Sequence, residues 1–142
     1  MLKIGDKVID FSCKDDSGKI INFSQYKGKK LVVFFYPKAD TPGCTAEACS
    51  LRDNYKEISQ LGYSILGVSA DTEKKQKSFS DKFQLNFPLI ADSEKEVINL
   101  FGVWGPKKFM GREYEGILRT TFIIDENAVI KRLSEDFNNK KI

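Results

Sequence analysis

The order of apolar runs and helical patterns along the chain predicts an α/β fold with a central sheet. Continuous apolar runs at residues 31–36 and 63–69 are typical of strands that are covered on both faces. Helical patterns follow each of these runs. Near the end of the chain, strand-like segments at 119–124 and 128–133 flank a short polar turn and predict a returning pair of strands.

The segment before the first buried run predicts a β-hairpin. Residues 8–13 alternate loosely between apolar and polar side chains, and 15–18 have the composition of a turn. Residues 19–23 follow as the second strand. We expect residues 24–28 to form a short helical turn or a loop.

The first long helix is predicted from Cys44 to about Leu61, where Gly62 ends it. A second helix is expected at residues 72–83, and it places two phenylalanines one turn apart on the same face. A short strand at 87–91 should follow this second helix.

A third helix is predicted after the pattern Ser93–Glu96, which fits a capping box. Its apolar face comprises Val97, Leu100 and Phe101. A glycine-rich loop is expected at 102–116, before the strand that Arg119 opens. A buried strand, a cysteine at the next helix start and a final strand pair together suggest a thioredoxin-like core with an N-terminal β-hairpin extension.

Composition predicts one globular domain spanning residues 1–142, since 41% of the residues are hydrophobic. The net charge of +3 is small and the lysines are spread along the chain, which argues against a nucleic-acid partner. No stretch approaches the roughly 20 apolar residues of a membrane span. The N-terminus lacks the apolar core of a signal peptide, so we expect a cytoplasmic protein whose thiols are kept reduced.

The absence of histidine excludes several chemistries. It removes Ser-His-Asp and Cys-His catalysis and the commonest transition-metal ligand. The three cysteines cannot complete a four-thiolate zinc site or an iron–sulfur cluster. We therefore expect no metal, and arginine, lysine, a hydroxyl or backbone dipoles must activate any reactive cysteine.

Cys44 is the candidate nucleophile. A buried strand ends at Tyr36, a turn containing proline and glycine follows, and a helix begins almost at the thiol. A helix N-terminus carries unpaired N–H donors and a partial positive charge, and this favours the reactive thiolate. The preceding turn is expected to expose the thiol. The alternative is a small buried apolar residue.

Cys49 is the candidate resolving thiol, and its alternative is a structural thiol on a helix face. Five residues of helix separate the two cysteines by ~7.5 Å along the axis. A disulfide needs Cα atoms about 4.4–6.8 Å apart. The pair therefore cannot bond until the first turns of the helix unwind. Cys13, on the predicted hairpin, is expected to be inert packing.

The segment at 35–49 resembles the active site of the peroxiredoxins. Pro37, Thr41 and Cys44 match the family motif at spacings of four and then three residues. The wider sequence is similar to the bacterioferritin-comigratory-protein (peroxiredoxin Q) subfamily over about residues 5–133. Matching stretches outside the active-site segment lie at 67–71, 86–89, 102–105 and 116–125. Members continue into a C-terminal helix, which looks missing or reduced in the short, polar segment 134–142.

The resemblance implies a role for each residue of the motif. Cys44 would be the peroxidatic cysteine and Cys49 would resolve its sulfenic acid. The Thr41 hydroxyl would hold the peroxide oxygen, although a helix N-cap is the alternative. Pro37 would shield the thiolate from water, although a simple strand terminator is the alternative.

Arg119 opens an apolar strand, which is an unusual place for a charge. Its planar guanidinium could favour the thiolate and stabilise charge on the departing oxygen, and the resemblance implies this role. The alternative is an arginine that points to solvent. Glu47 lies one turn after Cys44 and could orient Arg119, or it could be an ordinary first-turn carboxylate. Trp104 lies in the predicted glycine-rich loop. It could line the edge of the active site and bind a ligand, or it could pack against the core.

The leading hypothesis is a thiol-dependent peroxidase. It would reduce hydrogen peroxide or alkyl hydroperoxides, form an intramolecular Cys44–Cys49 disulfide and be recycled by a thioredoxin-type protein. No metal, haem or flavin is required. We expect a monomer, with a dimer as the alternative. Two other hypotheses are a thiol-disulfide oxidoreductase, which would be expected to carry Cys-x-x-Cys, and a non-enzymatic, redox-regulated holdase.

Overall fold

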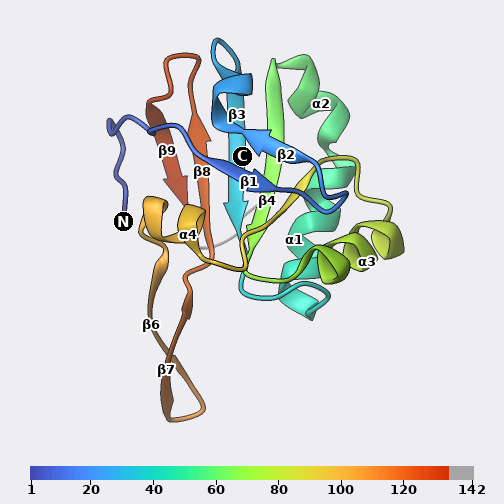
Figure 1. The fold of residues 1–142 in the computed structure, drawn as a ribbon, viewed down its shortest axis with the longest axis vertical. Coiled ribbons are helices and arrows are strands. Elements are labelled where there is room, and N and C mark those ends of the chain that lie inside the picture. Colours follow the sequence, from blue (N-terminus) through green and yellow to red (C-terminus); the bar gives the residue numbers. More distant parts are fainter. Residues whose placement is uncertain (135–142) are drawn as a thin grey trace.

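A five-stranded sheet with the order β5-β4-β3-β8-β9 forms the centre of this computed structural model, which describes residues 1–134 (Figure 1). Strands β3, β4 and β5 are parallel, whereas β8 is antiparallel to both β3 and β9. The strand bounds are Lys30–Phe35 (β3), Tyr63–Ser69 (β4), Leu89–Ala91 (β5), Thr120–Ile124 (β8) and Ile130–Ser134 (β9). The predicted mixed α/β fold of the thioredoxin-like type is confirmed.

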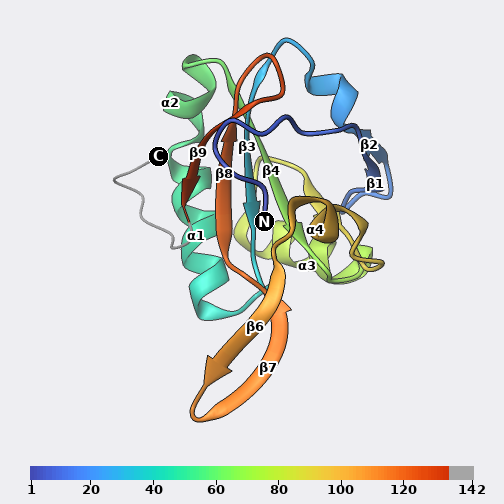
Figure 2. The same ribbon diagram turned by 90° about the vertical axis from the view of Figure 1, so that its left-hand side faces the viewer.

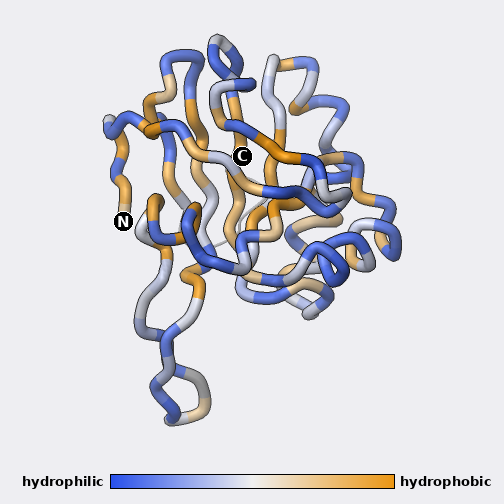
Figure 3. Tube along the Cα trace, viewed as in Figure 1, coloured by the Kyte–Doolittle hydropathy of each residue, from blue (hydrophilic) through white to orange (hydrophobic). Residues whose placement is uncertain are grey.

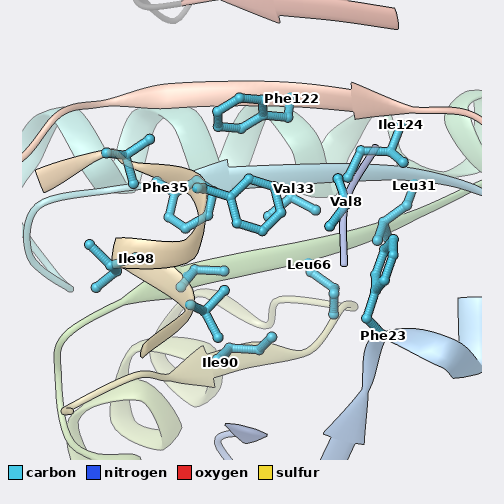
Figure 4. Close-up of a cluster of buried hydrophobic side chains, with 14 of the residues drawn as sticks. Val8, Phe23, Leu31, Val33, Phe35, Leu66, Ile90, Ile98, Phe122 and Ile124 are labelled. Atoms are coloured by element: carbon cyan, nitrogen blue, oxygen red, sulfur yellow. The ribbon is translucent and has the colours of Figure 1, made fainter. Parts of the chain in front are cut away.

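The side chains of β3 alternate between two cores, as expected for a strand covered on both faces. Leu31, Val33 and Phe35 belong to one buried cluster. Val32 and Phe34 belong to the other. Figure 4 shows part of the first cluster between β3, β8 and the helix α4, and apolar residues line the central strands in Figure 3. The sheet is therefore a shared wall between two apolar layers.

The helices α1 (Pro42–Asp53), α2 (Tyr55–Gln60) and α3 (Glu73–Phe83) contribute to the second layer. The predicted helix from Cys44 to Leu61 is wrong in its continuity, because it breaks at Asn54. The Asn54 side-chain amide donates to the Ser50 carbonyl at 2.8 Å, and it shares this acceptor with its own backbone N–H at 3.1 Å.

The predicted second helix is confirmed. The Thr72 hydroxyl caps α3 by accepting from the Lys75 backbone N–H at 3.3 Å. The rings of Phe79 and Phe83 meet edge to face with centroids 5.6 Å apart. Both rings therefore anchor this helix to the second layer.

An N-terminal hairpin and a short helix cover the other face of the sheet (Figure 2). The hairpin comprises β1 (Ser12–Lys14) and β2 (Ile20–Asn22), and a 3₁₀ turn follows at Phe23–Tyr26. The hairpin prediction is confirmed, although its strands are shorter than expected. A β-bridge between Asp15 and Ile90 ties it to β5.

The short helix α4 (Glu96–Phe101) exists as predicted, but the predicted capping box at its start is wrong. Lys95 occupies the N-cap position in a left-handed conformation, with φ of 60°. Asp92 accepts a hydrogen bond from the Ile98 backbone N–H at 2.8 Å. This carboxylate satisfies the helix start in place of Ser93.

The predicted glycine-rich loop is a β-hairpin formed by β6 (Trp104–Phe109) and β7 (Arg112–Ile117). It projects away from the rest of the fold (Figures 1 and 2). Its turn places Met110 and Gly111 at φ of 51° and 78°, as a tight hairpin turn requires. Gly105 and Pro106 in β6 and Gly116 in β7 interrupt the apolar alternation. The sequence pattern therefore did not reveal these two strands.

The expected loss of a C-terminal helix concerns residues 134–142; Ser134 ends β9, and residues 135–142 lie outside the described residues. Within residues 1–134, no helix has the length and apolar character needed to cross a membrane.

Candidate active site

Cys44 is the third residue of α1 and only 1% of its side chain is exposed, so the expected exposure of the thiol is wrong. The helical period explains the burial, because Cys44, Glu47, Ala48 and Leu51 share the face of α1 that packs toward the sheet. The thiol therefore combines a position in the first turn of a helix with shelter from solvent.

Thr41 occupies the N-cap position of α1, but its hydroxyl does not cap the helix. The hydroxyl donates instead to the Lys38 carbonyl at 2.9 Å. Its hydrogen is therefore engaged, while the oxygen keeps lone pairs that can accept a hydrogen bond. Pro37 is half-buried at the start of the same loop, directly after Tyr36.

Asp71 fixes the loop between β3 and α1. Its Oδ2 atom accepts from the Ala39 backbone N–H at 2.8 Å and from the Ser69 hydroxyl at 2.7 Å. The carboxylate thus joins the end of β4 to the loop that carries Pro37 and Thr41. Sequence reasoning did not assign this role, because only the parallel pairing of β3 with β4 brings the segments together.

Arg119 points into the site and not to solvent. Its Nη2 atom donates to the Cys44 Sγ at 3.4 Å. The guanidinium passes over Gly43, where an added Cβ atom would lie only 3.0 Å from Nη2. A side chain at position 43 would therefore crowd the guanidinium away from the thiol.

Glu47 lies on the inner face of α1, beyond the first turn, and is fully buried. Its Oε2 atom lies 3.6 Å from the Arg119 Nη1, too far for a hydrogen bond. Burial raises the pKa of Glu47 to about 7, although the nearby Arg119 charge opposes this shift. Within the described residues neither carboxylate oxygen has a hydrogen-bond partner, so the buried Glu47 is incompletely satisfied by its ion pair with the half-buried Arg119.

The other cysteines lie away from this cluster. Cys49 is half-buried on α1 and Cys13 is half-buried on β1, and all three thiols are free. The Cys13 thiol lies 3.5 Å from the Ala91 carbonyl. Burial, helped by the charge of Asp92, raises the pKa of Cys13 to about 11. Cys13 is thus a poor nucleophile, which agrees with the packing role expected for it.

Trp104 contributes packing at the base of the β6–β7 hairpin. Its indole N–H donates to Glu115 at 3.3 Å, and the Lys95 ammonium lies 4.3 Å from its ring centroid. It also packs partly buried against the first core layer. These contacts favour the packing interpretation over a binding role.

The cluster is suited to nucleophilic chemistry at sulfur. A thiol at a helix start beside a guanidinium is placed to react as the thiolate. The same guanidinium can stabilise negative charge on a departing oxygen. Within residues 1–134, no group of three or more histidine, cysteine, aspartate or glutamate side chains is placed to hold a metal ion.

Comparison with known proteins identifies the family. The family model for AhpC/TSA matches residues 4–133, which include every residue of this cluster. The chain belongs to the AhpC/TSA family. Similar proteins that cover nearly the whole chain are named peroxiredoxins, and the chain is accordingly a peroxiredoxin, a thiol peroxidase.

The similar proteins are peroxiredoxins of the Bcp and PrxQ type. The chain is 45% identical to peroxiredoxin Bcp of Escherichia coli (strain K12) over 136 residues, covering 96% of this chain and 87% of that protein. It is 42% identical to peroxiredoxin Bcp of Bacillus subtilis (strain 168), covering 99% and 88%. The crystal structure of peroxidoxin BcpB from Mycobacterium tuberculosis matches with a TM-score of 0.84 and 36% identity, covering 94% of this chain and 86% of that one.

Proposed function

We propose that this peroxiredoxin reduces hydrogen peroxide and alkyl hydroperoxides through Cys44. The contact of 3.4 Å between Arg119 Nη2 and Cys44 Sγ carries the proposal, because it pairs a buried thiol with a permanent positive charge. A structural relative supports the substrate class. The bacterioferritin comigratory protein of Xanthomonas campestris is described for its alkyl peroxide reduction activity, and it matches with a TM-score of 0.86 and 29% identity over 97% of this chain and 88% of that one.

In the first step the Cys44 thiolate attacks the terminal oxygen of the hydroperoxide. The O–O bond breaks, sulfur is oxidised to sulfenic acid, and the remaining oxygen takes a proton and leaves as water or an alcohol. Arg119 stabilises the charge on that oxygen. The Thr41 oxygen, whose own hydrogen is donated to the Lys38 carbonyl, accepts a hydrogen bond from the peroxide. Pro37 covers the thiolate, and the Glu47 carboxylate, 3.6 Å from Nη1, orients the guanidinium.

In the second step the Cys49 thiol attacks the sulfenic sulfur, forms the Cys44–Cys49 disulfide and releases water. Because both cysteines lie within α1, the first turns of this helix must open before the sulfur atoms can meet. A thioredoxin-type dithiol then reduces the disulfide and is itself oxidised. A reducing compartment such as the cytoplasm supplies this donor.

We propose that the active unit is a monomer. Cys44, Cys49, Thr41, Arg119 and Glu47 all belong to one chain, and their arrangement requires no second copy.

Peroxide consumption with a thioredoxin system tests the proposal. Wild-type protein should turn over, Cys44→Ser should be inactive, and Cys49→Ser should react once and then stall because its sulfenic acid has no partner. The stalled variant should also overoxidise more readily, as mass spectrometry would show. A disulfide linking Cys44 to Cys13 would contradict the assignment. Insulin reduction without peroxidase turnover would indicate a thiol-disulfide oxidoreductase instead.

A further inference from the structure

Two glycines lie opposite each other on one face of the β6–β7 hairpin. Gly105 and Gly116 are directly paired across the two strands. A Cβ atom added at Gly116 would lie 3.4 Å from the Lys107 Cδ atom, and one added at Gly105 would lie 3.3 Å from the Leu118 Cδ1 atom. Lys107 therefore packs beside Gly116, and Leu118 packs beside Gly105.

The position of Lys107 brings its charged end toward the active site. Its Nζ atom donates to the Ile117 carbonyl at 2.9 Å, two residues before Arg119. The hairpin leaves the fold at the end of the sheet where β3 ends and leads into α1 (Figures 1 and 2). Lys107 is half-buried, whereas its neighbour Lys108 is exposed and, by strand alternation, belongs to the opposite face.

The electrostatic surroundings of Lys107 include the reacting sulfur. Burial lowers the pKa of Lys107, the Arg119 charge lowers it further, and Cys44 opposes the shift. Within residues 1–134 the Lys107 ammonium forms no salt bridge with a carboxylate. Strand alternation assigns Glu113 and Glu115 of the same hairpin to its other face. The ammonium charge is therefore not cancelled locally.

We propose that Lys107 is a second positioning residue of the peroxidase site, whose charge favours the Cys44 thiolate together with Arg119. The inference rests on the proposed function of Cys44. Lys107 acts through the electric field and not by touching the peroxide. The projecting hairpin thereby becomes part of the active site.

The pH dependence of Cys44 alkylation tests this proposal without any peroxide. Iodoacetamide labelling of the full chain, quantified at Cys44 by mass spectrometry, gives the midpoint of the profile. Lys107→Met should move this midpoint upward by about half a pH unit, as expected for loss of one nearby half-buried charge. Lys108→Met removes the same charge from the exposed face and should leave the midpoint unchanged. Lys107→Arg should restore it.

An unchanged midpoint in Lys107→Met would overturn the proposal, and so would equal shifts in the Lys107 and Lys108 variants. Failure of Lys107→Arg to restore the midpoint would overturn it as well, because the effect would then not follow the charge. Thermal unfolding of each variant checks that the fold is retained. A wild-type chain that consumes no peroxide would refute the proposed function but leave the alkylation profile measurable, so the two failures are distinguishable.

Discussion

Arg119 and Cys44 are separated by 75 positions in the sequence, yet the Arg119 Nη2 donates to the Cys44 Sγ at 3.4 Å. The sheet register produces this contact. Phe35, at the end of β3, pairs with Thr120, at the start of β8. The residue before Thr120 therefore lies beside the loop that leads from β3 into α1, and the guanidinium reaches the first turn of the helix.

Replacing Arg119 should slow the attack on peroxide. In Arg119→Met the thiolate and the departing oxygen both lose a charged donor, and we expect a decrease on the order of 10²–10³-fold in the rate constant. Arg119→Lys keeps the charge but loses the planar fork, so it should be impaired to a smaller extent. Stopped-flow measurement of Cys44 oxidation checks both variants. Wild-type kinetics in Arg119→Met would show that the contact is not used.

Glu47 should make the stability of the protein depend on pH. Its pKa is about 7 in the folded chain, compared with the ordinary value of 4.5 expected when the chain is unfolded. Between these values the folded state binds more protons than the unfolded state, so the free energy of unfolding falls as the pH rises from about 4.5 to 7. The total change is on the order of 3 kcal/mol, since one pKa unit corresponds to about 1.4 kcal/mol.

Chemical denaturation across this pH range measures the effect. Glu47→Gln should remove the decline and be more stable than wild type near pH 8, because it buries no charge. Glu94 is exposed, and Glu94→Gln provides a control that should retain the decline. If the free energy of unfolding of the wild type changed with pH in the same way as that of Glu47→Gln, the raised pKa of Glu47 would be contradicted.

Cys13 should be dispensable and slow to react. Because burial raises its pKa to about 11, Cys13 is almost entirely a neutral thiol at pH 8. Alkylation followed by mass spectrometry should label Cys13 far more slowly in folded than in unfolded protein. Cys13→Ser should keep full peroxidase turnover. A turnover defect in this variant would assign Cys13 a function that its surroundings do not explain.

The main elements of the fold could be predicted because their signals are local. The apolar run that forms β3 and the run that forms β4 have the composition of buried strands, and the structure contains both. The β6–β7 hairpin could not be predicted in the same way. Its paired positions include Gly105, Pro106 and Gly116, and these residue types have no preference for strands. The two strands form because they hydrogen-bond to each other, and a local sequence pattern does not show this.

The candidate site could be predicted in its members but not in its geometry. The motif around Cys44 indicated which residues to consider, and the structure brings Arg119 and Glu47 to it. The burial of Cys44 was missed because the turn before the helix was interpreted alone, without the direction in which the helix face packs. Lys107 was missed because its approach to the site depends on the pairing of β6 with β7, which the sequence pattern did not reveal.

The final prediction concerns the helix that carries both reacting cysteines. Cys44 and Cys49 lie within α1, where the intact helix keeps their sulfur atoms apart. Disulfide formation should therefore break the helical hydrogen bonds around Cys44 and make this segment mobile. Opening is feasible at the start of α1, because helix ends have low local stability. Nearer its end, Leu51 is buried and Arg52 donates to the Phe83 carbonyl at 2.6 Å, so this part should hold.

Hydrogen exchange of the reduced and the disulfide forms measures this change. Protection over residues 44–52 should be lower in the disulfide form than in the reduced form. The decrease should be largest near Cys44 and smallest near residue 52. Helix α3, which carries neither cysteine, serves as the internal control and should exchange alike in both forms. Equal protection of residues 44–52 in the two forms would exclude resolution by local unwinding. In that case resolution of the Cys44 sulfenic acid by a thiol from another molecule becomes the better interpretation, because an intact α1 holds Cys49 out of reach.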